Sequence, residues 1–338
     1  MELDKFRESF DILFLEELKK LLERTKDRFH NPHIHEAISH VYILAQNGKR
    51  IRPYVLSLAY GARKKSDLLQ IKNQLIGIEL LHLFALIHDD IMDEAHTRHG
   101  VHTVHTFIEK KYRSLSRKKE QSNYEAILIG DLIFSYAYTT FFDKCPEEVT
   151  HIFQDLIEEV IAGQLIDIRI PYEKNVSKDL IYERMILKTA RYSFARPMQI
   201  GALLASKNRK DTQSMYNLGE ILGILFQITD DIIDTESEKR DLKKTPLQDL
   251  YNGQETFLTY TMKELNPLYY SQLNKYSRKS LSTNEVKIVK NIFNESGTLL
   301  KAREEIESLK AKAQKYISHL EDSDTWSQLL EKIIHRKS

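Results

Sequence analysis

The chain has 338 residues, with 50 basic and 49 acidic side chains and a single cysteine, Cys145. Balanced charge argues against a nucleic-acid partner, and one cysteine excludes an intramolecular disulfide framework and fits a reducing compartment. The start, Met1–Lys5, lacks the basic and apolar pattern of a signal peptide, and charges interrupt the apolar stretches. We therefore expect a soluble, cytoplasmic protein without a transmembrane anchor.

The spacing of apolar residues predicts helices along most of the chain. Eleven glycines and seven prolines leave long stretches without strong helix breakers, and no sustained alternation indicates strands. We predict an all-α chain of many helices joined by short loops, with one domain over residues 1–338. After a loop at 275–284, Ser282 or Thr283 would cap the next helix. The three-and-four spacing is clearest at Phe10, Leu13, Leu15, Leu18, Leu21 and Leu22.

The first chemical feature along the chain is a basic cluster, Gly48-Lys49-Arg50-Ile51-Arg52-Pro53. On a helix, Lys49 and Arg52 would point the same way, because they are three residues apart. Arginine offers phosphate oxygens a planar fork, and lysine offers a point charge. A basic cluster by itself is usually a surface feature, so a phosphate-binding role depends on what accompanies it.

An apolar run then ends at Asp89-Asp90-Ile91-Met92-Asp93. Asp89 and Asp93 would share one helix face, because residues four apart lie one above the other. His82 lies on that face two turns earlier, about 10 Å along the axis, although a lone histidine there is more often a core residue. Arg98 follows Asp93 by five residues, within reach of a phosphate that a metal ion holds.

Residues 109–123 carry six basic side chains against two acidic ones. We interpret this segment as a solvated loop or helix extension, because runs of charge usually face water. Contact with an anionic surface or a nucleic acid is the alternative.

The acidic pattern recurs as Asp230-Asp231-Ile232-Ile233-Asp234, again at the end of an apolar run. Carboxylates suit hard cations, and a few carboxylates combined with phosphate oxygens suit Mg²⁺ best. Two such clusters with spaced basic residues predict a magnesium site and a phosphorylated substrate between two helices. The polar residues that accompany the second cluster are Lys188, Thr189, Gln227, Lys244 and Asp249.

Together these motifs resemble those of the trans-isoprenyl diphosphate synthases of the polyprenyl synthetase family, over most of the chain. The matching segments are 48–53, 79–93, 126–131, 163–167, 188–190 and 223–234. The resemblance implies a bundle of long antiparallel helices around a central cavity, usually a homodimer. It also implies a Mg²⁺-dependent prenyltransferase that condenses isopentenyl diphosphate with an allylic diphosphate (dimethylallyl, geranyl or farnesyl diphosphate).

The resemblance assigns roles by position. It implies three magnesium ions with substrate bound, ligated by Asp89, Asp93 and Asp230 and supported by Asp90, Asp231 and Asp234. The residues implied for the allylic diphosphate are Arg98, Lys188, Thr189, Gln227 and Lys244, and those for isopentenyl diphosphate are Lys49, Arg52 and His82.

Two positions depart from the family pattern. Where the family has a second arginine after Arg98, this chain has His99, which is only partly charged near neutral pH. Where the family has a lysine after Gly253, it has Gln254. Residues 109–123 also resemble an insertion. We expect weaker substrate binding from these changes and the same reaction class.

Product length would depend on Phe84 and Ala85, five and four residues before Asp89. A ring about one and a half turns below the metal would obstruct a growing chain after a few prenyl units. On side-chain type alone, Phe84 is equally well explained as a core residue. The resemblance favours geranylgeranyl diphosphate (C20), with farnesyl diphosphate (C15) as the alternative.

Two other functions compete with a synthase. A class I terpene cyclase shares the implied fold, but its second metal site usually mixes Asn, Ser or Thr with Glu, and it has little use for Lys49, Arg52 and His82. A non-catalytic partner that regulates an active synthase would fit the loss of charge at His99 and Gln254. All six motif aspartates are present, which favours an active enzyme.

Overall fold

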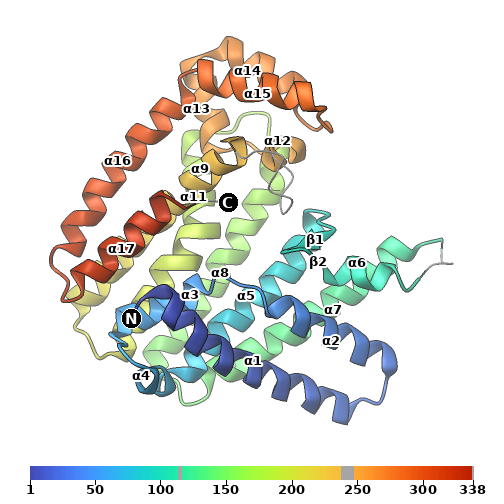
Figure 1. The fold of residues 1–338 in the computed structure, drawn as a ribbon, viewed down its shortest axis with the longest axis vertical. Coiled ribbons are helices and arrows are strands. Elements are labelled where there is room, and N and C mark those ends of the chain that lie inside the picture. Colours follow the sequence, from blue (N-terminus) through green and yellow to red (C-terminus); the bar gives the residue numbers. More distant parts are fainter. Residues whose placement is uncertain (113–115, 237–246, 337–338) are drawn as a thin grey trace. The chain divides into compact units, whose positions relative to one another are not determined.

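A computed structural model describes residues 1–112, 116–236 and 247–336. Almost every element within them is a helix, which confirms the predicted all-α class (Figure 1). The elements are α1 (Leu3–Arg28), α2 (Pro32–Ala45), α3 (Ile51–Tyr60), α4 (Lys65–Gln70), α5 (Lys72–Met92), β1 (Thr97–Arg98), β2 (Val101–His102), α6 (Val104–Glu109), α7 (Lys118–Phe142), α8 (Glu147–Arg169), η1 (Ile170–Tyr172), α9 (Lys178–Arg184), η2 (Met185–Ala195), α10 (Arg196–Leu204), α11 (Arg209–Glu236), α12 (Gln248–Asn252), α13 (Phe257–Leu265), α14 (Pro267–Leu273), η3 (Asn274–Tyr276), α15 (Thr283–Glu295), α16 (Thr298–Ile317) and α17 (Ser323–Ile334).

The chain groups into two compact units. The first comprises Met1–Thr150 with Ile200–Ser206, and the second comprises His151–Gln199 with Lys207–Ser338. The boundaries fall within α8 and α10, so these helices contribute to both units. The single domain over residues 1–338 and its central cavity stay predictions.

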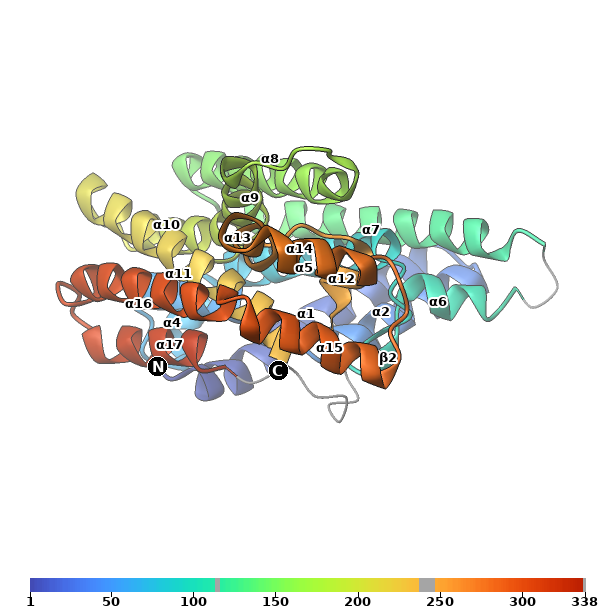
Figure 2. The same cartoon turned by 90° about the horizontal axis from the view of Figure 1, so that it is seen from above.

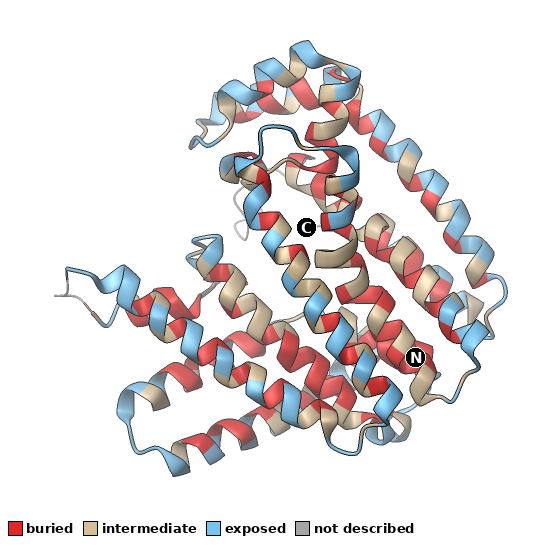
Figure 3. Ribbon diagram, turned by 180° about the vertical axis from the view of Figure 1, so that it is seen from behind, coloured by how far each residue is buried: buried red, intermediate tan, exposed pale blue. Residues whose placement is uncertain are grey.

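Helix α1 packs into the first unit through a row of aromatic rings. Phe6, Phe10 and Phe14 lie one turn apart, and the centroids of successive rings are 5.4 and 5.7 Å apart. All three side chains are fully buried, so the apolar spacing seen in the sequence marks the inner face of α1. Figure 3 shows that many other helices likewise have buried residues (red) on one face and exposed residues (pale blue) on another.

Arg50 joins three segments of the first unit at the turn before α3. Its Nε donates to Asp11 Oδ1 on α1 at 2.7 Å, and its Nη1 donates to Glu79 Oε1 on α5 at 2.8 Å. Its Nη2 donates to the carbonyl of Ala45. The Arg50 and Glu79 side chains are each 4% exposed, so these charges depend on one another for compensation.

We expect Arg50→Met to destabilise the protein by about 3 kcal/mol, because removing one partner leaves the Glu79 carboxylate buried and uncompensated. Urea unfolding followed by circular dichroism measures this loss. The double variant Arg50→Met, Glu79→Met should recover much of it, because a matched apolar pair replaces a buried ion pair well. Equal losses in the single and double variants would contradict this account.

Glycines let α5 and α7 approach closely. A methyl group on Gly77 of α5 would lie 2.6 Å from Phe141 Cβ on α7. One on Gly130 of α7 would collide with the ring of His88 on α5. Gln74 adds a hydrogen bond to the carbonyl of Phe141 at 3.1 Å. The two helices are therefore locked in register along the segment that leads to Asp89.

In the second unit, α11 is the central helix and packs against η2 and α16. Figure 2 shows α16 beside α17 in the C-terminal part of this unit. Helix α15 begins as the sequence predicts: Ser282 accepts a hydrogen bond from the backbone N–H of Glu285, whose side chain accepts one from the N–H of Ser282.

Most cations of the basic segment 109–123 that the structure describes are paired with carboxylates of the first unit. The pairs are Lys111–Glu36 (3.1 Å), Arg117–Glu120 (2.7 Å), Lys118–Glu109 (3.3 Å) and Lys119–Glu94 (3.0 Å). This pairing supports the interpretation of a solvated surface segment. Arg113, Ser114 and Leu115 lie outside the described residues.

No helix in the described part of the chain is both long and apolar enough to span a membrane.

Candidate active site

The first aspartate motif ends α5 as predicted, and its three carboxylates differ in environment. Asp90 is buried, whereas the Asp89 side chain is 26% exposed and Asp93, the C-cap, is exposed. Arg98 Nη2 lies 2.7 Å from Asp90 Oδ1 and 3.8 Å from Asp89 Oδ2. Burial raises the pKa of Asp90, while Arg98 opposes that rise. Asp90 therefore anchors Arg98, and Asp89 and Asp93 stay accessible to a ligand.

His82 lies within a group of positive charges in the first unit. Burial lowers its pKa well below the usual value, and the charges of Arg52 and Arg98 lower it further. His82 is therefore neutral at neutral pH and offers a hydrogen bond without a charge. The structure thus brings together three of the residues predicted to bind the substrate diphosphates.

Lys49 does not share a helix with Arg52. Helix α3 begins at Ile51, and Arg50, its N-cap, has a left-handed φ of 54°. The helical spacing considered in the sequence therefore does not apply to Lys49. The basic cluster is instead a sharp turn into α3, held by the buried contacts of Arg50.

His99 sits in a tight hairpin turn that the sequence did not predict. The strands Thr97–Arg98 and Val101–His102 are antiparallel, and His99 and Gly100 between them have φ values of 52° and 79°. Two positive φ values identify a type I′ turn. Histidine is among the residues that tolerate this left-handed region, and glycine adopts it freely.

From the resemblance to the isoprenyl diphosphate synthases, we expect His99→Arg to lower the KM for isopentenyl diphosphate about threefold. The variant adds a full positive charge beside Arg98, in a hairpin that already holds a non-glycine side chain at this position. Steady-state kinetics with isopentenyl diphosphate as the varied substrate measure the change, with His30→Arg on an exposed loop as control. An unchanged or higher KM would refute the role of position 99.

Phe84 is braced on two sides within the first unit. Its ring centroid lies 4.6 Å from that of His88 and 5.0 Å from that of Phe134 on α7. His88 Nε2 donates to the carbonyl of Ile127 at 3.1 Å, which fixes the ring against α7. Phe84 and Ala85 remain partly accessible. The Phe84 ring is therefore held by His88 and Phe134 and is still partly exposed on α5.

The second aspartate motif lies on α11, near its C-terminal end. Asp231 is buried and accepts hydrogen bonds from Gln227 Nε2 at 2.8 Å and from the N–H of Phe257 at 3.3 Å. Asp234 accepts from the N–H groups of Gln248 and Asp249 at 3.3 and 3.4 Å. These bonds hold the carboxyl groups of Asp231 and Asp234 in place.

Asp230 is more accessible than the buried Asp231, with a side chain that is 39% exposed. It forms an ion pair with Arg336, whose guanidinium lies 3.8 Å above the ring of Phe226. A cation that binds Asp230 would compete with Arg336 for this carboxylate.

The second unit concentrates buried carboxyl groups around this motif. Burial raises the pKa values of Asp231 and Asp234, and the nearby carboxylate of Asp249 raises both further. The pKa of Asp249 is raised in turn, again mainly by burial. Crowded, partly desolvated carboxylates of this kind are the environment that a divalent cation would relieve.

Lys188 and Thr189 are held at adjacent positions of η2. Lys188 Nζ lies 2.6 Å from Asp167 Oδ2 on α8, and Thr189 Oγ1 donates to Gln227 Oε1 on α11 at 2.8 Å. Asp167 also receives Arg184 Nη1 at 3.3 Å. No sequence motif pointed to a role for Asp167 or Arg184, although the segment 163–167 resembles the family.

Gln254 contacts the same region, because its Nε2 donates to the carbonyl of Asp167 at 3.2 Å. It also lines a cavity of about 190 Å³ that includes Lys263 and Arg278. Lys244, which was predicted to bind the allylic diphosphate, lies outside the described residues.

The carboxylates fit magnesium with a phosphorylated substrate better than a protein-only metal cage. Over residues 1–112, 116–236 and 247–336, no three acidic, histidine or cysteine side chains converge as a candidate cage. Mg²⁺ is usually bound by one or two carboxylates with water and substrate phosphates. Asp89 and Asp93, and separately Asp230, are accessible carboxylates of that type.

Comparison with known proteins identifies the family to which this helical chain with two aspartate motifs belongs. The family model of the polyprenyl synthetases matches residues 32–295, so the chain belongs to this family and is a prenyltransferase. Geranylgeranyl diphosphate synthase of Sulfolobus acidocaldarius is 32% identical over 69% of this chain and 68% of that protein.

Two further similarities bear on function and fold. A short chain isoprenyl diphosphate synthase of Methanocaldococcus jannaschii is 30% identical over 72% of this chain and 68% of that protein. The crystal structure of a geranylgeranyl pyrophosphate synthase from Corynebacterium glutamicum, complexed with isoprenyl diphosphate and magnesium, has a TM-score of 0.88 over the full length of both chains. Its identity of 23% makes this a similarity of fold.

Proposed function

We propose that the protein elongates an allylic diphosphate with isopentenyl diphosphate and stops at geranylgeranyl diphosphate. The observation that carries the proposal is the pair of aspartate motifs, each of which combines buried supporting carboxylates with accessible ones. The named relatives include a geranylgeranyl diphosphate synthase, which supports the C20 product.

The proposed metal ligands are Asp89, Asp93 and Asp230, the accessible carboxylates of their motifs. Magnesium would be the cofactor, since these are oxygen ligands that leave room for diphosphate oxygens. Bound there, magnesium would neutralise the negative charge that builds on the departing diphosphate. Three ions, as the family resemblance implies, are part of this proposal.

The chain's own cationic and polar side chains would bind the two substrates separately. We assign Arg98, Lys188, Thr189, Gln227 and Lys244 to the allylic diphosphate, and Lys49, Arg52, His82 and His99 to isopentenyl diphosphate. Arg98 and Lys188 are each aligned by a carboxylate, Asp90 or Asp167, before substrate arrives. Such preorganised charge stabilises a developing anion without reorganisation during the reaction.

The chemistry needs no protein nucleophile. As the carbon–oxygen bond of the allylic diphosphate breaks, the double bond of isopentenyl diphosphate forms the new carbon–carbon bond, provided it is held close and aligned. The product cation then loses a proton, which we assign to the departing diphosphate. The neutral His82 suits hydrogen bonding to isopentenyl diphosphate rather than proton removal, because its lowered pKa makes it a weak base.

The C20 limit rests on Phe84 in this proposal. Its ring is supported by His88 and Phe134, so a growing chain cannot displace it easily. Farnesyl diphosphate remains the alternative product, if the obstruction acts one prenyl unit earlier.

A homodimer is the proposed assembly. Helix α7 exposes Tyr124, Leu128 and Tyr138, which are 56, 66 and 43% exposed along one side of the helix. Rows of exposed apolar side chains on one helix are typical of protein interfaces. Sedimentation of the purified protein checks the assembly.

A cytoplasmic location is likewise a proposal, based on the single cysteine, and cell fractionation checks it.

Product analysis tests the proposed function. Purified protein is incubated with magnesium, isopentenyl diphosphate and each of the three primers, and the dephosphorylated products are identified by mass spectrometry. We expect C20 from all three primers. C15 as the final product from dimethylallyl and geranyl diphosphate would keep the reaction and refute the C20 limit, whereas products beyond C20 would refute the obstruction by Phe84.

A further inference from the structure

Lys188 and Thr189 lie on an unusual element. Residues Met185–Ala195 form a π-helix of 11 residues, whereas most π-helices are single-turn bulges. The wider turn of a π-helix makes poorer internal contacts, so neighbouring elements must hold it in this form.

Glycines on α8 and α11 allow the backbone of η2 to pack closely against both helices. A methyl group on Gly163 of α8 would collide with the backbone of Lys188. On α11, the same change at Gly223 would strike Ala190, and at Gly219 it would strike Ala195. The π-helix is therefore seated against α8 and α11 along nearly its whole length.

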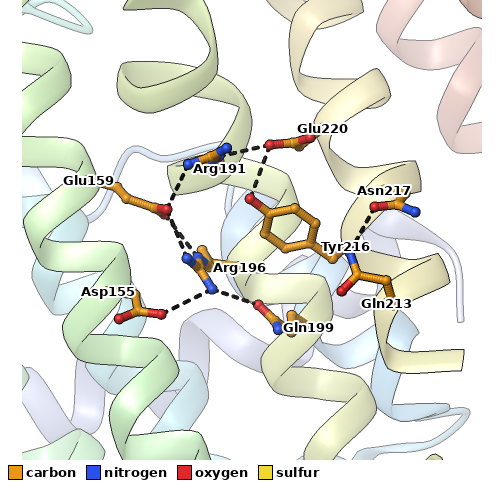
Figure 4. A network of polar contacts seen from close by, with 9 residues as sticks. All are labelled: Asp155, Glu159, Arg191, Arg196, Gln199, Gln213, Tyr216, Asn217 and Glu220. Carbon is orange, nitrogen blue, oxygen red and sulfur yellow. Dashed lines mark hydrogen bonds and ion pairs between the residues drawn. The ribbon is translucent and has the colours of Figure 1, made fainter. Parts of the chain in front are cut away.

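A polar network holds the C-terminal half of the π-helix to the same two helices (Figure 4). Arg191 Nη1 donates to Glu159 Oε1 on α8 at 2.9 Å, and its Nε donates to Glu220 Oε1 on α11 at 2.8 Å. Arg196, the C-cap of η2, donates to both carboxylate oxygens of Glu159, at 2.8 and 2.9 Å. The Glu159 side chain is 15% exposed, so it is a well-desolvated acceptor for both arginines.

Glu159 lies on the same ridge of α8 as Asp167, the partner of Lys188. Glu159, Gly163 and Asp167 are spaced four residues apart on α8 and form one ridge of that helix. Asp167, the partner of Lys188, thus lies about 12 Å along the axis from Glu159. The ridge contacts the π-helix at three successive points, namely Arg191, the backbone of Lys188 and the ammonium of Lys188.

We propose that Glu159 is a positioning residue for the allylic substrate, because it holds Arg191 and Arg196 so that the π-helix presents Lys188 and Thr189 to the diphosphate. This inference rests on the proposed function for the roles of Lys188 and Thr189. The proposed effect of Glu159 passes through its hydrogen bonds to Arg191 and Arg196. Its effect should therefore be on the placement of the diphosphate ligands and not on the chemical step.

The test is Glu159→Gln in the full-length protein, which keeps the shape and removes the charge. We expect the KM for the allylic diphosphate to rise about tenfold, with the KM for isopentenyl diphosphate changed by less than twofold. Asp155→Asn is the matched control: Asp155 contacts Arg196 from the same helix at 3.3 Å, but its side chain is 50% exposed. Both KM values should stay unchanged in this control, because Arg196 keeps its two bonds to Glu159.

A purely structural role for Glu159 predicts a lower melting temperature and a lower kcat with both KM values unchanged, and that result would overturn the proposal. An equal rise in both KM values would overturn it as well. If Glu159→Gln does not fold, Glu220→Gln replaces it, since this variant weakens the Arg191 contact to α11 and leaves the Glu159 contacts in place. The other bond to Glu220 Oε1, donated by the Tyr216 hydroxyl at 3.0 Å, lies within α11. We then expect about a threefold rise in the allylic KM, and no rise would refute the proposal.

Lys188→Ala, measured in parallel, separates this inference from the proposed function. A raised allylic KM in Lys188→Ala with an unchanged one in Glu159→Gln overturns the positioning role alone. An unchanged allylic KM in both variants overturns the assignment of Lys188 and the positioning role together.

Discussion

Asp89→Asn should lower kcat by about a thousandfold, which corresponds to about 4 kcal/mol of lost transition-state stabilisation. The substitution preserves the size of the side chain and removes one negative charge from an accessible position of the first motif. A metal ion bound there would lose a charged ligand where diphosphate charge develops, so the loss should fall on kcat. Initial rates over a range of magnesium concentrations measure it.

Asp27→Asn is the control for this variant, because Asp27 is an exposed aspartate at the end of α1 and should leave kcat unchanged. Excess magnesium should restore little of the activity of Asp89→Asn if the carboxylate acts in the transition state. Full activity of Asp89→Asn at ordinary magnesium concentrations would contradict the assignment of the first motif as a metal site.

Phe84→Ala should shift the main product from C20 to longer chains. The substitution removes a ring that His88 and Phe134 hold in place, so the obstruction disappears without a change in the motif aspartates. Chromatography of the dephosphorylated products with farnesyl diphosphate as primer shows the shift.

Phe134→Leu serves as a graded comparison. It removes one of the two rings that support Phe84 and keeps Phe84 itself, so we expect a mixture of C20 and longer products. Unchanged product length in Phe84→Ala would refute the role of this ring in product length. Phe84 would then be explained as an ordinary core residue.

The sequence predicted the elements whose pattern is local. The three-and-four spacing placed α1, and the two aspartate clusters at the ends of apolar runs fell on α5 and α11. Ser282 was one of two caps, with Thr283, that the sequence predicted for α15, and the structure shows that Ser282 is the cap. Each of these signals depends on neighbours within one or two helical turns.

What the sequence did not predict depends on distant contacts or on backbone angles. The hairpin at His99 has two-residue strands, which are too short to show alternation. The π-helix has the same apolar spacing as an ordinary helix, and its form depends on Gly163 and Gly223 of other helices. The ion pair between Asp167 and Lys188 was not predicted, because it joins two separate elements, α8 and η2.

The alternatives to a synthase differ most in what the protein does with isopentenyl diphosphate. The most direct measurement is the incorporation of labelled isopentenyl diphosphate into acid-labile product by the purified chain alone, with magnesium and an allylic primer. We predict incorporation that requires both the primer and magnesium. No incorporation by folded protein would contradict the account and favour a non-catalytic partner, and conversion of the primer without consumption of isopentenyl diphosphate would favour a cyclase.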